Sequence, residues 1–231
     1  MTALSIAIPI AASLFWLWVI TRHDDHEREP WPLVALAIGL GALVTFGVLW
    51  TRPWLEHLLH PASAVVEAFV VTAAAEEAWK LLALVPLLAL REVDEPLDGA
   101  IYGAAVGLGF AAAEDLWLAG GSPDLWLQMQ RGATASLLHA ACTGCLGLCF
   151  AEGKLRAPGA GTAGWLALGV VVAVAAHGGY DLFLDGDRAR ALLSLLVVLP
   201  LALALLAAKV RWARSRSHEF HPPADPPAAN R

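Results

Sequence analysis

The chain has 231 residues, of which 58% are hydrophobic and only 16% charged, and its formal net charge is -6. A soluble globular domain carries about 25% charged residues, so this composition excludes an ordinary soluble domain and indicates an integral membrane protein. Outside the short C-terminal stretch no basic patch is interleaved with aromatic residues, so nucleic acid is not an expected partner.

Apolar runs of about 20 residues recur along the chain, and each is long enough to cross ~30 Å of hydrocarbon as a helix. The N-terminus lacks the positive region and cleavage site of a signal peptide, so we expect the first run to be a retained span. The third run is long for one crossing, which predicts a tilt, a kink at Pro86 or an interfacial start near Glu67. The fold class is therefore an all-α polytopic bundle of seven transmembrane helices, predicted at 3–20, 33–50, 62–90, 98–119, 129–151, 162–184 and 190–210.

These runs divide the chain into four parts. Two transmembrane helices lie in 1–61, a core of four helices that carries the polar motifs in 62–184, one helix in 185–212, and a disordered tail in 213–231. With the N-terminus outside and the C-terminus in the cytoplasm, ten Lys and Arg residues lie on the cytoplasmic side and four on the outer side. The positive-inside rule therefore predicts this orientation in the cell membrane.

Glu76, Glu77 and Lys80 place three ionisable side chains inside the third run, between Phe69-Val-Val and Leu81-Leu-Ala-Leu-Val. One charge at the centre of a membrane helix costs about 2.5–3.5 kcal/mol, so three would cost roughly 8–10 kcal/mol unless they are paired. Glu76 and Lys80 are four residues apart on one helix face, which predicts an ion pair with Lys80 as a structural counter-ion. Intramembrane carboxylates are candidates for function.

The fourth run carries glycines at four-residue spacing, in Asp98-Gly99-x-x-x-Gly103-x-x-x-Gly107. Such stripes let helix backbones approach closely in lipid, so Gly103 and Gly107 are predicted to be packing residues. The same face continues to Glu114, which is therefore expected to point into the bundle. Asp98 is a candidate helix cap, and the neighbouring Asp115 is expected to face solvent at the outer boundary.

The fifth and sixth runs supply two histidines. His139 is followed one turn later by Thr143, and His177 and Asp181 are four residues apart on one helix face. A lone histidine in an apolar helix usually bonds a neighbouring backbone, but the joint occurrence of these groups on four helices indicates a site. In the predicted orientation, this site lies between the centre and the outer half of the membrane.

Two chemistries suit these residues. A carboxylate beside imidazoles can take a proton from a water that attacks an amide carbonyl, while another donor stabilises the oxyanion. Alternatively, two histidines and a carboxylate form a common Zn²⁺ ligand set, with one position open for the hydrolytic water. The three cysteines, Cys142, Cys145 and Cys149, could form a metal or redox site, but without a second cysteine pair we interpret them as packing residues.

The motifs together resemble the PrsW family of intramembrane proteases, which is related to CAAX-processing and bacteriocin-processing enzymes. The resemblance runs from about residue 65 to 185 and rests on four motifs in family order: Glu76-Glu77-x-x-Lys80, Leu97-Asp98-Gly99 through Glu114-Asp115, His139-x-x-x-Thr143 and His177-Gly-x-Tyr180-Asp181. It implies an integral-membrane endopeptidase whose partner is a membrane-anchored protein substrate, of the anti-sigma-factor kind, cleaved within the lipid bilayer.

The resemblance also implies roles for residues. Glu76 and His139 would activate water, Glu77 would be the second acid of the motif, and His177 and Asp181 would polarise the scissile carbonyl or complete a metal site. The last motif of the CAAX-processing relatives ends in Asn, which donates to an oxyanion, whereas Asp181 cannot donate unless it is protonated. Asp181 therefore fits a metal ligand or a group that orients His177. This departure favours a metal-dependent reaction with Glu76, His139, His177 and Asp181 as ligands and Zn²⁺ as cofactor, although a metal-free, glutamate-activated water stays open.

Two other functions compete with proteolysis. A proton-coupled or ion-coupled transporter would also use intramembrane Glu, His and Asp, but no matching pair of half-sequences indicates the inverted repeats of such proteins. A non-catalytic scaffold of the same fold would be expected to lose part of the catalytic set, and this chain has all of it.

Overall fold

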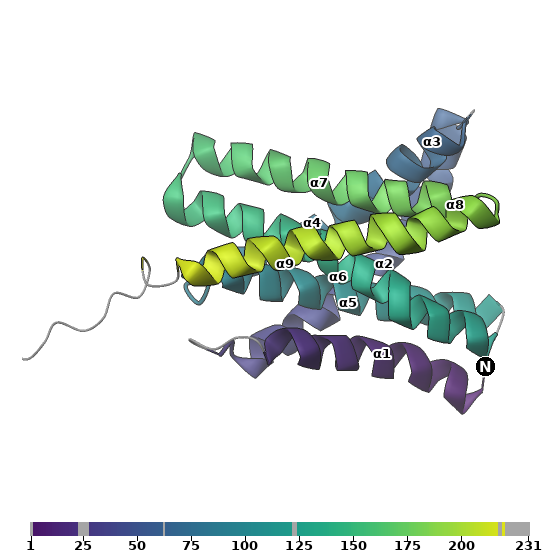
Figure 1. Ribbon diagram of the computed structural model, residues 1–231, viewed down its shortest axis with the longest axis horizontal. Coiled ribbons are helices and arrows are strands. Elements are labelled where there is room, and N and C mark those ends of the chain that lie inside the picture. The colour runs from purple at the N-terminus through teal and green to yellow at the C-terminus, as the bar shows by residue number, and fades with distance from the viewer. Residues whose placement is uncertain (1, 23–27, 62, 122–123, 217–218, 220–231) are drawn as a thin grey trace, which may run out of the picture.

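The computed structural model describes residues 2–22, 28–61, 63–121, 124–216 and 219, and these residues form a bundle of long helices (Figure 1). Six helical segments in the described chain are long and apolar enough to cross a membrane, so the protein is a multi-pass membrane protein. They are α1 (Ala3–Thr21), α2 (Trp31–Leu59), α5 (Pro96–Gly121), α6 (Leu125–Arg156), α7 (Ala160–Leu184), and the continuous rod Arg188–Ser215 formed by α8 (Arg188–Leu193), η2 (Ser194–Val198) and α9 (Leu199–Ser215).

The third predicted span is helical too, but it is built from three pieces. These are α3 (Ala64–Val66), the π-helical segment η1 (Glu67–Ala74) and α4 (Ala75–Leu88), which follow one another without a break. The helix passes through Pro86 to Leu88, and its π-helical irregularity lies in η1, which begins at Glu67. Single π-turns in helices are frequent at functional sites. The π-helical segment η1 ends at Ala74, two residues before Glu76.

The second helix is longer than predicted, because 51–61 was expected to be a joint and α2 continues through Pro53 to Leu59. Its extension is tied to the third span by two side-chain contacts, Arg52 Nη2 to Glu67 Oε1 at 3.0 Å and Trp79 Nε1 to Thr51 Oγ1 at 3.1 Å. At the other end of the chain, α9 continues to Ser215, three residues into the predicted tail. Residues 217, 218 and 220–231 of that tail lie outside the described part.

Helix α5 lies at the centre of the bundle and contacts α1, α2, α4, α6 and α9 (Figure 1). Its small residues allow this position: an added Cβ at Gly103 would lie 2.3 Å from the Thr143 carbonyl oxygen, and one at Gly107 would lie 2.4 Å from that of His139. The predicted packing role of the glycine stripe is therefore confirmed. Because α6 carries His139, the close contact of α5 and α6 also sets the depth and direction of that side chain.

Candidate functional site

Lys80 is the centre of a buried polar network between α4 and α6. Its ammonium group is 2.9 Å from Glu77 Oε1, 3.2 Å from Glu76 Oε2 and 2.8 Å from His139 Nδ1, and the residue has no exposed surface. The predicted Glu76–Lys80 pair is confirmed, and Lys80 also contacts a histidine 59 residues away. A buried ammonium with three such partners offsets much of the cost of placing two carboxylates in hydrocarbon.

The two consecutive glutamates have different surroundings, because neighbouring helical residues point about 100° apart. Glu77 is enclosed: besides Lys80, it accepts a hydrogen bond from Thr143 Oγ1 at 3.3 Å and lies 2.9 Å from His177 Nδ1. An ionised Glu77 carboxylate only accepts hydrogen bonds, so Nδ1 of His177 carries the proton and donates a hydrogen bond to Glu77. This contact orients the imidazole so that Nε2 faces the other acidic groups.

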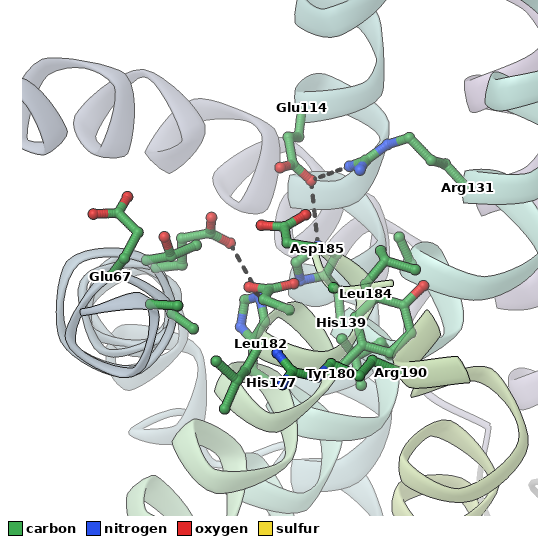
Figure 2. A pocket seen from close by; sticks show the side chains of 18 of the residues that line it. Glu67, Glu114, Arg131, His139, His177, Tyr180, Leu182, Leu184, Asp185 and Arg190 are labelled. Carbon is green, nitrogen blue, oxygen red and sulfur yellow. Dashed lines mark hydrogen bonds and ion pairs between the residues drawn. The ribbon is translucent and has the colours of Figure 1, made fainter. Parts of the chain in front are cut away.

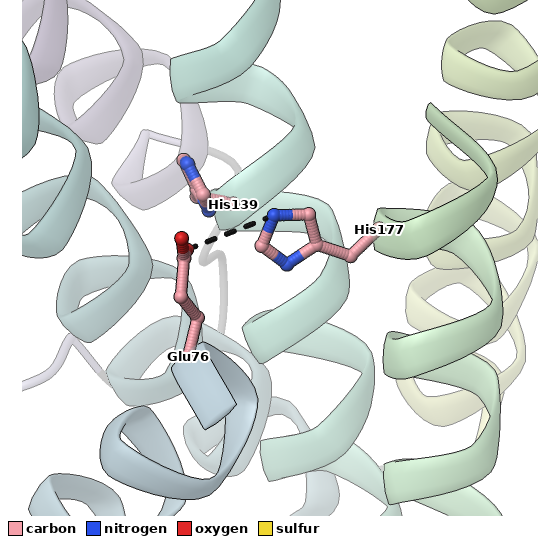
Figure 3. Close-up of side chains that lie close together, drawn as sticks. All are labelled: Glu76, His139 and His177. Carbon is pink, nitrogen blue, oxygen red and sulfur yellow. Dashed lines mark ion pairs between the residues drawn. The ribbon is translucent and has the colours of Figure 1, made fainter. Parts of the chain in front are cut away.

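Glu76, His139 and His177 lie close together, as Figure 3 shows, and each comes from a different helix. One candidate ligand atom from each residue lies within 4.8 Å of those of the other two, and all three side chains are buried. Two imidazole nitrogens and one carboxylate oxygen are a donor set that suits Zn²⁺. Both ring nitrogens of His139 have other neighbours, Lys80 Nζ and Glu114 Oε2, so a cation bound there would replace one of these contacts.

Asp181 lies beside this group. Its Oδ2 is 3.3 Å from His177 Nε2, which confirms the predicted i, i+4 contact, but Asp181 is not among the three residues whose ligand atoms converge. The ring Nε2 of His177 is 3.7 Å from Glu76 Oε2, so both carboxylates face the same nitrogen. Asp181 is thus placed to orient His177, and ligation of a metal by it would require the side chain to move.

A cavity of about 260 Å³ leads to these residues, and Figure 2 shows its lining. Glu76, His139, His177 and Asp181 line it, whereas Glu77 does not. Its other walls come from the outer ends of helices in the predicted orientation: Arg52 of α2, Glu67 and Thr72 of η1, Glu114 of α5, Arg131 of α6, and Asp185 and Arg190 near the start of α8. That the site lies between the centre and the outer half of the membrane stays a prediction, because it depends on this orientation.

Glu114 points into the cavity, as the glycine face predicted, and its Oε2 is 3.3 Å from His139 Nε2 and 2.7 Å from Arg131 Nη2 (Figure 2). The expectation for Asp115 is wrong: it is buried and its Oδ1 accepts a hydrogen bond from Arg131 Nε. Arg131 was counted only among the four basic residues on the outer side, so the sequence analysis missed it as a site residue. The sequence did contain a signal for this role: Arg131 lies eight residues, about two helical turns, before His139, which places both residues near one face of α6.

Asp98 and the cysteines lie away from the cavity. Asp98 was predicted to cap the helix, but it lies inside the first turn of α5, and its Oδ2 accepts hydrogen bonds from the preceding backbone N–H groups of Asp94 and Glu95 at 3.0 and 2.8 Å. It therefore fixes the turn that enters α5. The three cysteines are buried and unoxidised, and they do not belong to the candidate metal group found among the described residues. Their interpretation as packing residues agrees with this placement.

The profile of the "PrsW family intramembrane metalloprotease" matches residues 29–207. That range includes all four motifs and most of the helices that build the site. The chain belongs to this family. The PrsW-type chain is therefore an intramembrane protease, and the cavity with its buried Glu and His residues is its candidate active site.

Individual relatives carry the same name. The Protease PrsW of Bacillus subtilis (strain 168) is 28% identical over 184 residues, covering 78% of this chain and 82% of the relative. The Protease PrsW of Clostridioides difficile (strain 630) is 27% identical over 201 residues, covering 82% of each chain. That of Geobacillus kaustophilus (strain HTA426) is 31% identical over 112 residues, covering 48% of this chain and 50% of the relative. No solved structure matches this chain.

Proposed function

We propose that this protease hydrolyses a peptide bond of a membrane-anchored protein within the cavity, using Glu76, His139 and His177. The observation that carries the proposal is the convergence of these three buried side chains at the inner end of a cavity that opens between helix ends. An extended peptide segment next to a transmembrane helix could enter such a cavity, whereas a folded soluble protein could not reach residues at that depth. We propose an anchored substrate of the anti-sigma-factor kind, as the resemblance implies.

The residues divide between chemistry and support. Zn²⁺ held by Glu76, His139 and His177 would supply Lewis-acid activation of a water and of the peptide carbonyl. Glu114 lines the same cavity beside His139 and is then the carboxylate that takes the water's proton and passes it to the leaving amine. In a metal-free reaction, Glu76 takes the proton instead, because it is the glutamate of the pair that lines the cavity.

Supporting roles fall to the enclosed residues. Glu77 keeps the proton of His177 on Nδ1. Lys80 holds the side chains of Glu76, Glu77 and His139 in position through its three contacts. Asp181 orients His177 from the other side of the ring. We further propose the division of the chain into two N-terminal helices, a catalytic core in 62–184 and a C-terminal helix, an orientation with the N-terminus outside, and the kinship with CAAX-processing enzymes.

The first test measures bound metal per chain by elemental mass spectrometry in detergent-purified protein, alongside cleavage of a membrane-anchored peptide. Near-stoichiometric zinc that is lost in His139→Ala/His177→Ala supports the metal-dependent alternative. No metal in a preparation that still cleaves supports a water activated by Glu76. A Glu76→Ala/His177→Ala variant that cleaves at the wild-type rate would overturn the assignment of the site.

A further inference from the structure

Four charged and titratable groups form a continuous chain across the α5–α6 contact, from the interior of the bundle to the catalytic histidine. Asp115 Oδ1 accepts a hydrogen bond from Arg131 Nε. Arg131 Nη2 is 2.7 Å from Glu114 Oε2, and the same Glu114 oxygen is 3.3 Å from His139 Nε2 (Figure 2). Glu114 and Asp115 are consecutive on α5, and the planar fork of one guanidinium engages both. None of the four motifs of the family resemblance includes Arg131.

We propose that Arg131 is a positioning residue of the proteolytic site, which holds Glu114 against His139 and is itself anchored by Asp115. The inference rests on the proposed function, because it takes Glu114 and His139 as members of the active site. Without the guanidinium, Glu114 and Asp115 would lose the cation that they share, beside a cavity that is also lined by Glu76 and Asp181. Like charges without a counter-ion between them repel one another, so Glu114 would turn away from His139.

The burial of Asp115 supports its role as the residue that anchors Arg131. Its exposed fraction is 1%, and no described residue donates a hydrogen bond to its second oxygen, Oδ2. A buried carboxylate is costly unless it is paired, and Arg131 is the cation that pairs with it. Arg131 itself lines the cavity and its side chain is 22% exposed, so the guanidinium sits between a fully enclosed acid and one that faces the substrate space.

The chain offers a matched control in Arg52. This arginine lines the same cavity and also engages two carboxylates with its fork, through Nε to Glu56 Oε1 at 2.9 Å and Nη2 to Glu67 Oε1 at 3.0 Å. Neither of these carboxylates contacts His139 or His177 in the described structure. Arg52→Gln therefore removes a similar ion-pair fork from the cavity wall while it leaves the catalytic group intact.

The test compares Arg131→Gln, Arg131→Lys and Arg52→Gln in the full-length protein in detergent. Kinetics on a membrane-anchored peptide give kcat and KM, and imidazole NMR of ¹⁵N-histidine-labelled protein, assigned with His139→Ala, reports on His139 directly. We expect Arg131→Gln to lower kcat by roughly 10- to 100-fold, with KM changed less than about twofold, because a group that supports an active-site residue is lost. Lysine keeps the charge but not the fork, so Arg131→Lys should recover only part of kcat.

The NMR spectrum keeps the test independent of activity. The His139 Nε2 resonance should shift in Arg131→Gln and stay near the wild-type position in Arg52→Gln. If Arg131→Gln does not fold, Arg131→Lys and Asp115→Asn provide the same comparison. A wild-type protein that does not cleave the peptide refutes the proposed function, while the His139 shift still tests the position of Arg131. An unchanged His139 resonance and unchanged kcat in the folded Arg131 variants would overturn the inference.

Discussion

The substitution Gly107→Ala should separate α5 from α6 at the level of the active site. The added Cβ would lie 2.4 Å from the carbonyl oxygen of His139 and 2.7 Å from its carbonyl carbon, whereas ordinary contact begins at 3.4 Å. Both atoms belong to backbone, so no flexible side chain can give way. The two helices would have to move apart by about 1 Å at this point, in a core that is packed as densely as an organic crystal.

The magnitude follows from that displacement. Inserting a methyl group into a close-packed contact costs roughly 1–3 kcal/mol of stability. The activity should suffer more, because the clash falls on the backbone of His139 itself and would displace the imidazole from Glu76 and His177. A misplacement of about 1 Å at a catalytic group can cost roughly 100-fold in rate, so we expect kcat/KM of Gly107→Ala to fall by about that factor.

Gly144→Ala is the matched control on the facing helix. An added Cβ there would lie 3.4 Å from the Ala100 carbonyl oxygen and 3.5 Å from the Leu206 side chain, which is ordinary contact. The assay is cleavage of a membrane-anchored peptide by detergent-purified protein, with thermal unfolding measured on the same samples. If Gly107→Ala cleaves as fast as Gly144→Ala at equal stability, the reasoning that the glycine contact fixes the position of His139 is refuted.

Three further predictions concern the buried polar groups and the cysteines. Lys80→Met should destabilise the protein by about 3–5 kcal/mol, because it leaves two buried glutamates without their cation; a thermally stable but inactive variant would contradict this structural role. Glu77→Gln should weaken zinc binding by roughly 10- to 100-fold through His177, as measured by metal titration, and an unchanged affinity would count against the orienting contact. Replacing Cys142, Cys145 and Cys149 together by Ala should leave cleavage and metal content within about twofold of wild type, since none belongs to the candidate metal group.

Local spacing predicted much of this structure. The apolar runs located every helix, because a membrane span has a fixed minimum length, but they placed the end of α2 nine residues too early. The four-residue spacings predicted the Glu76–Lys80 and His177–Asp181 contacts, since residues four apart share a helix face, and the structure has both. The glycine stripe of α5 likewise predicted a close helix contact and the inward direction of Glu114.

Contacts between distant helices could not be predicted in the same way. Glu77 contacts Thr143 and His177, which are 66 and 100 residues away in the sequence. The residues before and after the Glu76-Glu77 pair are apolar, so the sequence did not indicate which glutamate would face the cavity. The error at Asp115 has the same origin: its side of α5 was assumed to face solvent, but the start of α6 covers it and supplies Arg131. The π-helical segment before Glu76 has no distinctive sequence pattern, because its residues also suit an α-helix.

The charge balance of the site favours a bound cation in the active protein. Five carboxylates gather there, from Glu76, Glu77, Glu114, Asp115 and Asp181, and the cations in contact with them are Lys80 and Arg131. If both histidines are neutral, the group carries three uncompensated negative charges in a region that is mostly buried. Uncompensated charges are costly in hydrocarbon. A divalent ion at the Glu76, His139 and His177 group would neutralise two of these three negative charges. Protonation of carboxylates is the alternative way to neutralise them.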